Sequence, residues 1–311
     1  VIQTKALTRY FGAKPAVRDL DLAVPRGCVF AFLGRNGSGK TTTIRMLLGL
    51  LEPSRGWARV LGHDARALPH ELRAKIGYLA EGHWLPRWMR VGDLERFQSG
   101  SFPRWSREIF QSVVRHFRLD ARSRAGDLSR GERAGLCLAL ALAPEPELLI
   151  LDDPATGLDP VARRSLLEAM VYVTRETGRT ILFSSHLISD VERVADQMAI
   201  LDGGVLKVQC SVETFRSRVR QFVLRYPGSP PEPPGIPGIL QAVRGRSETR
   251  LIVANATDGI VAGLQGLGAS SVEEVPLGFE DACIGYLGAR GERSFFLSNL
   301  GASSREEEET W

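Results

Sequence analysis

The 311 residues are enough for one large domain, or for one domain with a smaller second one. With 43% hydrophobic and 24% charged residues, the composition is that of an ordinary globular protein and excludes a disordered or fibrous chain. The formal net charge of +4 does not by itself predict nucleic-acid binding, and the longest apolar run, residues 136–143, is too short to span a membrane. The cysteines lie far apart without metal-ligand spacing, which is typical of reduced core residues: Cys28, Cys137, Cys210 and Cys283.

The first informative segment in the chain is residues 34–42, which match the phosphate-binding loop pattern of Gly, four variable residues and Gly-Lys-Thr. An apolar run at 28–33 predicts a buried strand before it, and a helical run at 41–51 follows it. The glycines let backbone N–H groups turn toward phosphate oxygens, and the helix adds its positive N-terminal end. Lys40 would then reach the terminal phosphates, and Thr41 would ligate Mg²⁺. The alternative is a chance match in a Gly-rich loop, and both flanks argue against it.

Aromatic residues precede this loop. Residues 2–8 and 17–24 alternate enough to predict two strands, joined by a loop that carries Tyr10, Phe11 and Gly12. Two aromatic residues ahead of a glycine are compatible with plain hairpin packing and equally with stacking on a purine ring.

After strands predicted at 57–61 and 75–80, the chain changes character. Residues 84–125 show helical periodicity at 91–98 and 107–117, with Pro86 and Pro103 as breaks. We interpret this region as a helical insertion into an α/β domain, extending to about residue 144.

The next motif is Leu-Ser-Arg-Gly-Glu at residues 128–132, which precedes an apolar helix at 133–143. Ser129 is a plausible N-cap, and Glu132 three residues later completes a capping box. From the residues alone, the motif therefore indicates a well-started helix and nothing more specific.

Acidic and basic groups follow two further apolar strands. The strand predicted at 147–151 ends in Asp152 and Asp153, and the strand predicted at 180–184 is followed by His186. In open α/β sheets functional groups gather at the carboxyl ends of strands, so an acidic strand end downstream of a phosphate loop predicts the Mg²⁺-side carboxylate. His186 could be a packing residue, and its position favours a γ-phosphate sensor.

The last third of the chain is predicted to contain a separate appendage. Asp-Gly-Gly at 202–204 predicts a hairpin between strands at 197–201 and 205–209, and a short helix is expected at 212–219. A Pro/Gly-rich linker follows, and beyond it strands and a helix alternate. We expect an N-terminal domain at 1–226, a linker at 227–238, a small α+β appendage at 239–300 and a disordered acidic tail at 301–311.

Taken in order, these motifs resemble the nucleotide-binding subunit of an ABC transporter over residues 2–208. The order is phosphate loop, helical insertion, LSRGE, ILDDP, GLDP and SSH. The resemblance implies an α/β fold of the P-loop NTPase type, with a RecA-like core, an antiparallel β subdomain and the helical insertion, plus the C-terminal α+β appendage. It also implies an ATPase that uses ATP and Mg²⁺, dimerises head to tail when it binds ATP, and powers a membrane transporter.

The resemblance assigns roles residue by residue. Phe11 would stack on adenine, with Tyr10 as the second choice; Asp153, His186 and Glu81 would be catalytic, and Asp159 would contact the other subunit. The remaining nucleotide-binding residues would be Gly34, Asn36, Gly37, Ser38, Gly39, Lys40, Thr41 and Thr42. The metal residues would be Thr41, Asp152 and Glu81, and the signature that binds the γ-phosphate held by the other subunit would be Ser129, Arg130, Gly131 and Glu132.

Some positions depart from the family's usual residues. Arg130 replaces the usual signature Gly, Glu132 its closing Gln, Asp153 the catalytic Glu, and Glu81 the lid Gln. Such changes, together with Leu-Gly-Phe-Glu-Asp at 277–281, resemble a bacterial subgroup paired with ABC-2-type exporters, including antibiotic self-protection systems. The shorter Asp153 keeps a weakly or non-hydrolysing ATP switch open as an alternative, and a soluble ABC ATPase in DNA repair or translation is the other.

The resemblance also implies partners and a location. The chain would pair with itself or with a paralogous ATPase subunit, dock on integral membrane permease subunits, and lie on the cytoplasmic face of the membrane through them. No nucleic-acid partner is expected. The cargo, the direction of transport and the choice between homodimer and heterodimer stay open.

Overall fold

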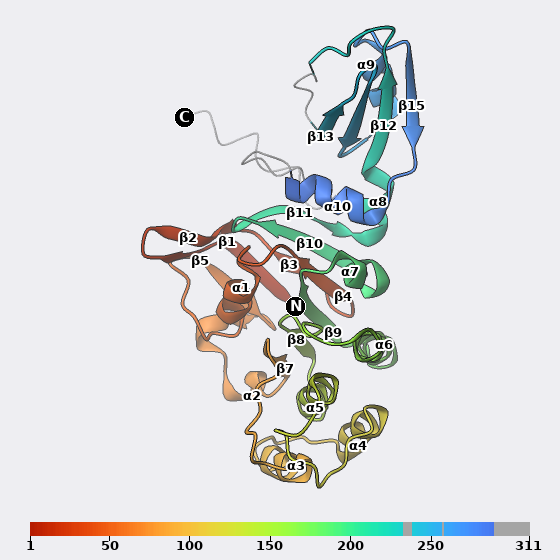
Figure 1. The fold of residues 1–311 in the computed structure, drawn as a ribbon. Coiled ribbons are helices and arrows are strands. Elements are labelled where there is room, and N and C mark those ends of the chain that lie inside the picture. The colour runs from red at the N-terminus through yellow and green to blue at the C-terminus, as the bar shows by residue number, and fades with distance from the viewer. Residues whose placement is uncertain (233–237, 257, 289–311) are drawn as a thin grey trace, which may run out of the picture. The chain divides into compact units, whose positions relative to one another are not determined.

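The computed structural model, shown in Figure 1, describes residues 1–232, 238–256 and 258–288. It divides into two compact units, one made of residues 1–196 with 203–205, and the other made of 197–202 and the chain from 206 onward. The tail predicted at 301–311 lies outside the described residues.

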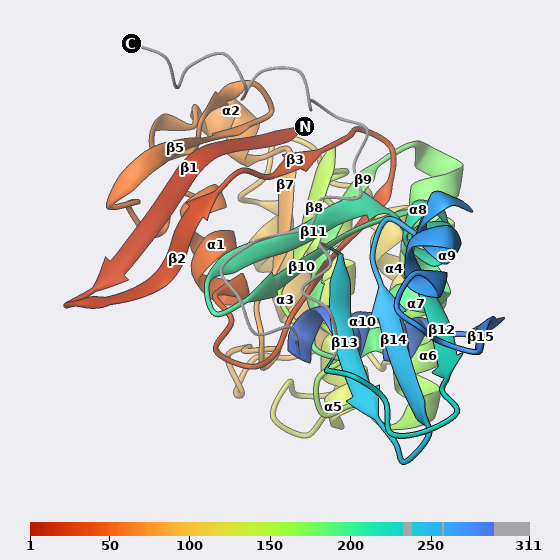
Figure 2. The ribbon, with the colours of Figure 1, turned by 90° about the horizontal axis from the view of Figure 1, so that it is seen from above.

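An antiparallel sheet opens the first unit. Its strand order is β2-β1-β5-β6, and β3 pairs with the start of β1. Figure 2 shows β1 and β2 as a long ribbon. The strands are β1 (Ile2–Phe11), β2 (Lys14–Leu20), β3 (Ala23–Val24), β5 (Arg55–Val60) and β6 (His63–Asp64).

The pairing of β1 with β2 shows that the prediction of a loop at Tyr10 and Phe11 is wrong. Both belong to β1, because the ladder continues to its end, where Tyr10 pairs with Pro15 and Phe11 with Lys14. The turn is thereby reduced to two residues, and Gly12 adopts the left-handed conformation that such a turn requires, with φ +58°.

A parallel sheet forms the core of the first unit, with neighbouring strands in the order β4-β9-β8-β7. Three of the four strands are buried along their whole length, which is why they read as continuous apolar runs in the sequence. Their carboxyl ends meet at one edge, where the motifs following β4, β8 and β9 are expected to converge. The strands are β4 (Val29–Leu33), β7 (Ile76–Leu79), β8 (Leu148–Leu151) and β9 (Thr180–Ser185).

Helices cover both faces of this sheet. Helices α5, α6 and α7 pack along one face, and α1 lies on the other, against the antiparallel sheet (Figure 1). The helices are α1 (Lys40–Leu47), α5 (Arg130–Leu142), α6 (Pro160–Thr177) and α7 (Ile188–Val194), with a 3-10 turn (Ala65–Ala67) and the short α2 (His70–Arg73) before β7.

The predicted helical insertion is present as α3 (Val91–Ser99) and α4 (Arg107–His116), which pack against α5. Buried Val91, Phe110 and Leu136 belong to the small apolar core that these helices share. The insertion is therefore a helical lobe attached to the parallel sheet through α5, and the predicted α/β fold class is confirmed.

The second unit contains a four-stranded antiparallel sheet in the order β13-β14-β12-β15. Apolar residues of this sheet and of α9 form its core. The elements are β10 (Gln197–Asp202), β11 (Val205–Ser211), α8 (Val212–Arg218), β12 (Arg220–Arg225), β13 (Ile239–Arg244), β14 (Glu248–Val253), α9 (Asp258–Gln265), β15 (Ser271–Val275) and α10 (Phe279–Gly288).

The boundary expected at residue 226 differs from this division. Strand β12 precedes the Pro/Gly-rich linker, yet it pairs with β14 on one side and β15 on the other, so it is a central strand of the appendage. The predicted boundary followed the local composition of the linker, whereas the sheet is assembled from strands that lie far apart in the chain. Phe279, at the start of α10, packs edge-on against Phe215 with ring centroids 5.4 Å apart.

Candidate nucleotide-binding and catalytic site

The loop between β4 and α1 folds around Lys40. Gly37 and Gly39 adopt φ +79° and +105°, conformations that favour glycine, and they let the loop curl over the start of the helix. The Lys40 ammonium donates to the carbonyl oxygens of Gly34 at 2.7 Å and Arg35 at 3.2 Å, and the residue is only 7% exposed. Burial lowers the pKa of Lys40, and nearby carboxylates act against this shift: Asp153, Asp152 and Glu81.

A chain of hydrogen bonds crosses the carboxyl edge of the parallel sheet. The Thr41 hydroxyl, in α1, donates to Asp152 Oδ1 over 3.1 Å, and the Ser184 hydroxyl, in β9, donates to the same oxygen over 2.8 Å. Ser184 Oγ in turn accepts the backbone N–H of Asp153 at 2.8 Å. The Asp153 carboxylate lies 2.8 Å from His186 Nδ1. Residues from three separate motifs are thus joined into one polar group.

The second oxygen of the Asp152 carboxylate indicates where a metal fits. Asp152 Oδ2 is buried and has no hydrogen-bond partner, whereas Oδ1 has two. A buried unpaired carboxylate oxygen is costly unless a cation or a water accompanies it. Among the described residues, no cluster of three or more His, Cys, Asp or Glu could hold a metal. Mg²⁺ needs no such cluster, since it typically takes one or two carboxylates together with waters and substrate phosphates.

Asp153 lies in a strained backbone conformation, with φ +45° in the left-handed region that a non-glycine residue rarely adopts. Such strain persists only where neighbours fix the backbone, as the Ser184 bond does here, and it concentrates at functional sites. The prediction that Asp153 and His186 act in one site is compatible with this geometry. Ser184 was missed in the sequence, because a serine inside a buried strand gives no signal until its neighbouring strand is known.

Glu81 follows the end of β7 and is exposed. Its carboxylate acts on the pKa of Lys40, so it lies within electrostatic reach of the phosphate loop. Two residues later, His83 is buried, and its Nε2 lies 2.9 Å from the carbonyl oxygen of Pro154, the residue after Asp153. Burial is the main cause that lowers the pKa of His83, and Arg133 lowers it further. Sequence reasoning passed over His83, because its partner lies 71 residues away.

Phe11 presents an aromatic ring at the end of β1. The residue is 52% exposed, and the Arg9 guanidinium carbon lies 5.0 Å from the centre of its ring. Tyr10 is partly buried, and its backbone N–H donates to the Ser54 hydroxyl. Of the two aromatic residues, Phe11 therefore has the ring surface on which a planar base could stack.

The signature segment begins α5 with the predicted capping box. Ser129 Oγ accepts the Glu132 backbone N–H at 3.2 Å, and Glu132 Oε2 accepts the Ser129 backbone N–H at 2.8 Å. Next to them, Arg130 is exposed and lies beside Gly157. In the described part of the chain, no hydrogen bond or ion pair joins this segment to the phosphate loop.

Gly131 faces the start of α6 instead. A Cβ atom at Gly131 would lie 2.6 Å from the Cβ atom of Ala162, closer than real Cβ atoms approach. Asp159 caps the same helix, because its Oδ1 accepts the backbone N–H groups of Val161 at 2.9 Å and Ala162 at 3.1 Å. Within one chain, Gly131 and Asp159 thus have structural roles, and their expected contacts with another subunit stay predictions.

Comparison with known proteins supports a nucleotide site. A family model described as "ABC transporter" matches residues 17–156. The bacitracin transport ATP-binding protein BcrA of Enterococcus faecalis is 32% identical over 226 residues, covering 71% of this chain and 73% of that protein. The daunorubicin/doxorubicin resistance ATP-binding protein DrrA of Streptomyces peucetius is 35% identical over 230 residues, covering 72% and 69%.

Solved structures agree with this similarity. The structure of an ATP-binding subunit of an ABC transporter is 30% identical, with a TM-score of 0.63 over 70% of this chain and 92% of that one. A dimeric bacterial ABC transporter cassette has a TM-score of 0.62 at 20% identity, a likeness in fold alone. The chain therefore belongs to the ABC transporter family and is an ATP-binding subunit with the ATPase activity of that family. None of its described helices is both long and apolar enough to cross a bilayer.

The exposed ring of Phe11 generates a prediction about ATP affinity. Replacing Phe11 by Ala should weaken ATP binding up to about a hundredfold, because stacking on an aromatic ring contributes about 1–3 kcal/mol per base. Tyr10→Ala serves as the matched control and should change the affinity little. Both are measured by titration with a fluorescent ATP analogue, and the reverse ranking would move the base-stacking role to Tyr10.

The close approach of Gly131 to Ala162 generates a second prediction. Gly131→Ala should lower the free energy of unfolding by about 1–3 kcal/mol without nucleotide, because its new methyl group collides with Ala162. Ala162→Gly, combined with it, should recover at least half of that loss, since it removes the opposing methyl group. Urea denaturation of both single variants and the double variant measures the coupling. Strictly additive effects would mean that the contact between α5 and α6 is not the cause.

Proposed function

We propose that this ABC-family ATPase powers an exporter by closing on ATP as a head-to-tail dimer and opening after hydrolysis. The observation that carries the proposal is the hydrogen-bonded group beside Lys40, which joins the phosphate loop to the acidic strand end and to His186. A nucleotide held by the loop would then have a hydroxyl, two carboxylates and an imidazole beside its terminal phosphate.

Phosphate binding would begin at the loop. Its backbone N–H groups and the N-terminus of α1 would hold the phosphate oxygens. Lys40, which donates to two carbonyl oxygens of the loop, would exchange these contacts for the terminal phosphates. Thr41 and Asp152 would hold Mg²⁺, since Asp152 Oδ2 has no other partner. When bound, Mg²⁺ neutralises charge on the β- and γ-phosphates.

Asp153 would accept the proton of the attacking water. Its carboxylate accepts from His186 Nδ1, so the imidazole, in the tautomer with the proton on Nδ1, keeps Nε2 free to accept a hydrogen bond from the attacking water. Asp is one methylene shorter than the usual Glu, so the carboxylate would lie farther from the γ-phosphate. We therefore expect slow turnover, with Glu81 adding a second carboxylate near the water and the metal.

Each site would be completed by the partner subunit. Ser129 uses its oxygen as an acceptor in the capping box, which leaves its hydroxyl proton free to donate to a γ-phosphate oxygen of the opposite nucleotide. The N-terminal N–H groups of α5 around Gly131 would add to this contact. Two such sites related by a two-fold axis make ATP the link between the subunits, whether the second subunit is a copy or a paralogue.

Export is supported by what the relatives are called. Their names refer to bacitracin transport, daunorubicin/doxorubicin resistance and, for a Rhizobium leguminosarum bv. viciae protein 36% identical over 208 residues, Nod factor export. This last match covers 65% of this chain and 67% of that protein. We propose that the chain acts at the cytoplasmic face of the membrane, held there by an integral membrane permease, without a nucleic-acid partner.

The proposed base gives a direct test on the purified chain. Asp153→Asn should bind ATP and Mg²⁺ but hydrolyse it at least about a hundredfold more slowly, because the amide cannot accept the proton. The variant should then accumulate as an ATP-bound dimer, measured by light scattering as twice the mass of one chain. Asp153→Glu should keep or raise turnover.

Lys40→Ala is the matched control, since it should abolish both dimer and turnover by removing the cation at the phosphates. If Asp153→Asn hydrolyses ATP as fast as the parent while Glu81→Gln or His186→Ala stops turnover, the base lies elsewhere. A dimer that forms equally well without nucleotide would contradict ATP as the link between subunits.

The permease is tested in membranes. Where a multi-span membrane protein is found encoded beside its gene, the chain co-produced with it should sediment with membranes, and its ATP turnover should rise at least several-fold. Lys40→Ala should sediment equally while hydrolysing nothing, because docking does not need the phosphates. A chain that stays in the soluble fraction with unchanged turnover would exclude this membrane protein as its partner and favour the soluble ATPase.

A further inference from the structure

A buried histidine joins the loop that carries Glu81 to the turn that carries Asp153. His83 is 5% exposed, and its Nε2 lies 2.9 Å from the carbonyl oxygen of Pro154. A carbonyl oxygen can only accept, so Nε2 carries the proton and donates it. Because proline has no backbone N–H, this carbonyl is the only hydrogen-bonding group that Pro154 possesses.

The local backbone conformation turns the His83 side chain inward. Gly82 and His83 are consecutive residues in the left-handed region, with φ +84° and +52°. This sharp turn sends the His83 ring into the protein and leaves Trp84 on the surface, 85% exposed. A left-handed histidine is a strained position, and such positions persist where a specific contact holds them.

The partner segment is strained in the same way. Asp153 has φ +45°, its N–H is bonded to Ser184, and its carboxylate is bonded to His186. These contacts fix the N-terminal side and the side chain of Asp153, and the His83 bond holds the peptide that follows Pro154, one residue farther along the chain. Two strained loops that flank the nucleotide site are therefore held together by one side-chain hydrogen bond.

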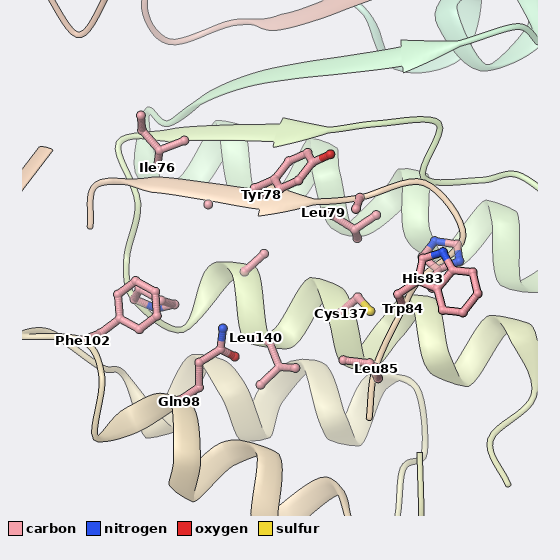
Figure 3. Close-up of a pocket in the computed structure, with 14 residues that line it drawn as sticks. Ile76, Tyr78, Leu79, His83, Trp84, Leu85, Gln98, Phe102, Cys137 and Leu140 are labelled. Carbon is pink, nitrogen blue, oxygen red and sulfur yellow. The ribbon is translucent and has the colours of Figure 1, made fainter. Parts of the chain in front are cut away.

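His83 also forms a wall of a cavity. The cavity has a volume of about 330 Å³ and lies between β7, α5 and the helical insertion. Figure 3 shows His83 and Trp84 together at one end of it, beyond Leu79, while Gln98 and Phe102 lie at the opposite end. A shift of the loop at this end of the cavity would move the donor away from Pro154.

We propose that His83 is a positioning residue for ATP hydrolysis: its hydrogen bond to the Pro154 carbonyl sets the direction of the Asp153 carboxylate and ties it to the loop that carries Glu81. The inference rests on the proposed role of Asp153. Among the described residues, no hydrogen bond joins His83 to the phosphate loop or to Asp152, so we expect it to act on the chemical step and to leave nucleotide binding to the phosphate loop.

Two nearly isosteric substitutions separate this role from plain packing. Glutamine places its amide nitrogen close to the position of histidine Nε2 and can donate to the same carbonyl, whereas methionine has similar length and no donor. Both are equally strained at φ +52°, so their difference isolates the hydrogen bond. Steady-state ATPase assays of the purified full chain give kcat and KM, and equilibrium titration gives the ATP dissociation constant.

We expect His83→Met to lower kcat about tenfold to a hundredfold, the size of effect that a misplacement of about 1 Å produces, with the ATP dissociation constant changed less than about twofold. His83→Gln should retain kcat within about threefold of the parent. The exposed His70, at the start of α2, is the matched control, and His70→Met should leave both constants unchanged.

The kcat values and ATP affinities of these variants test the positioning role of His83. Equal kcat values for the glutamine and methionine variants would overturn the positioning role, as would a loss of ATP affinity that parallels the loss of kcat. Asp153→Asn is assayed beside them: if it retains the turnover of the parent, the proposed role of Asp153 fails and the inference fails with it. If Asp153→Asn is inactive while His83→Met matches the parent, only the inference about His83 fails.

Discussion

The carboxylate of Asp152 is the junction on which the site depends. It is 1% exposed, and its Oδ1 accepts hydrogen bonds from Thr41 in α1 and from Ser184 in β9. One oxygen atom thus links the helix to the strand. A buried carboxylate is strongly disfavoured unless hydrogen bonds and an opposite charge compensate it, and Lys40 is the buried cation beside it. Removing Lys40 would take this buried cation away from the carboxylates beside it, so the phosphate loop and the acidic strand end stabilise each other before any nucleotide binds.

Most of this site could be predicted because its motifs are local. The phosphate loop, the acidic end of β8 and His186 each follow an apolar strand, and parallel strands bring their carboxyl ends to one edge. The capping box was also readable, since both of its partners lie within four residues. What could not be predicted depends on distant neighbours. Ser184 gains its role from β8, and His83 from a carbonyl 71 residues away.

The same reason explains the misplaced boundary of the second unit. A Pro/Gly-rich segment is a strong local signal for a linker, and it drew the boundary to residue 226. The six residues of β12 carry only a short apolar stretch between charged ends, and their place at the centre of the sheet comes from pairing with β14 and β15. Local composition thus located the linker, while sheet membership was set by contacts that no local pattern encodes.

The departures in the signature segment have a local physical reason. Glu132 takes the place of the usual glutamine, and its charged oxygen accepts from the Ser129 N–H at the positive end of α5, which favours an anion over a neutral amide. The same charge would repel a γ-phosphate brought to that helix end by a second subunit. Arg130 lies between Ser129 and Glu132 in the sequence, and it is exposed. Within this chain, Glu132 therefore strengthens the start of α5, and the exposed Arg130 adds an opposite charge to the same helix end.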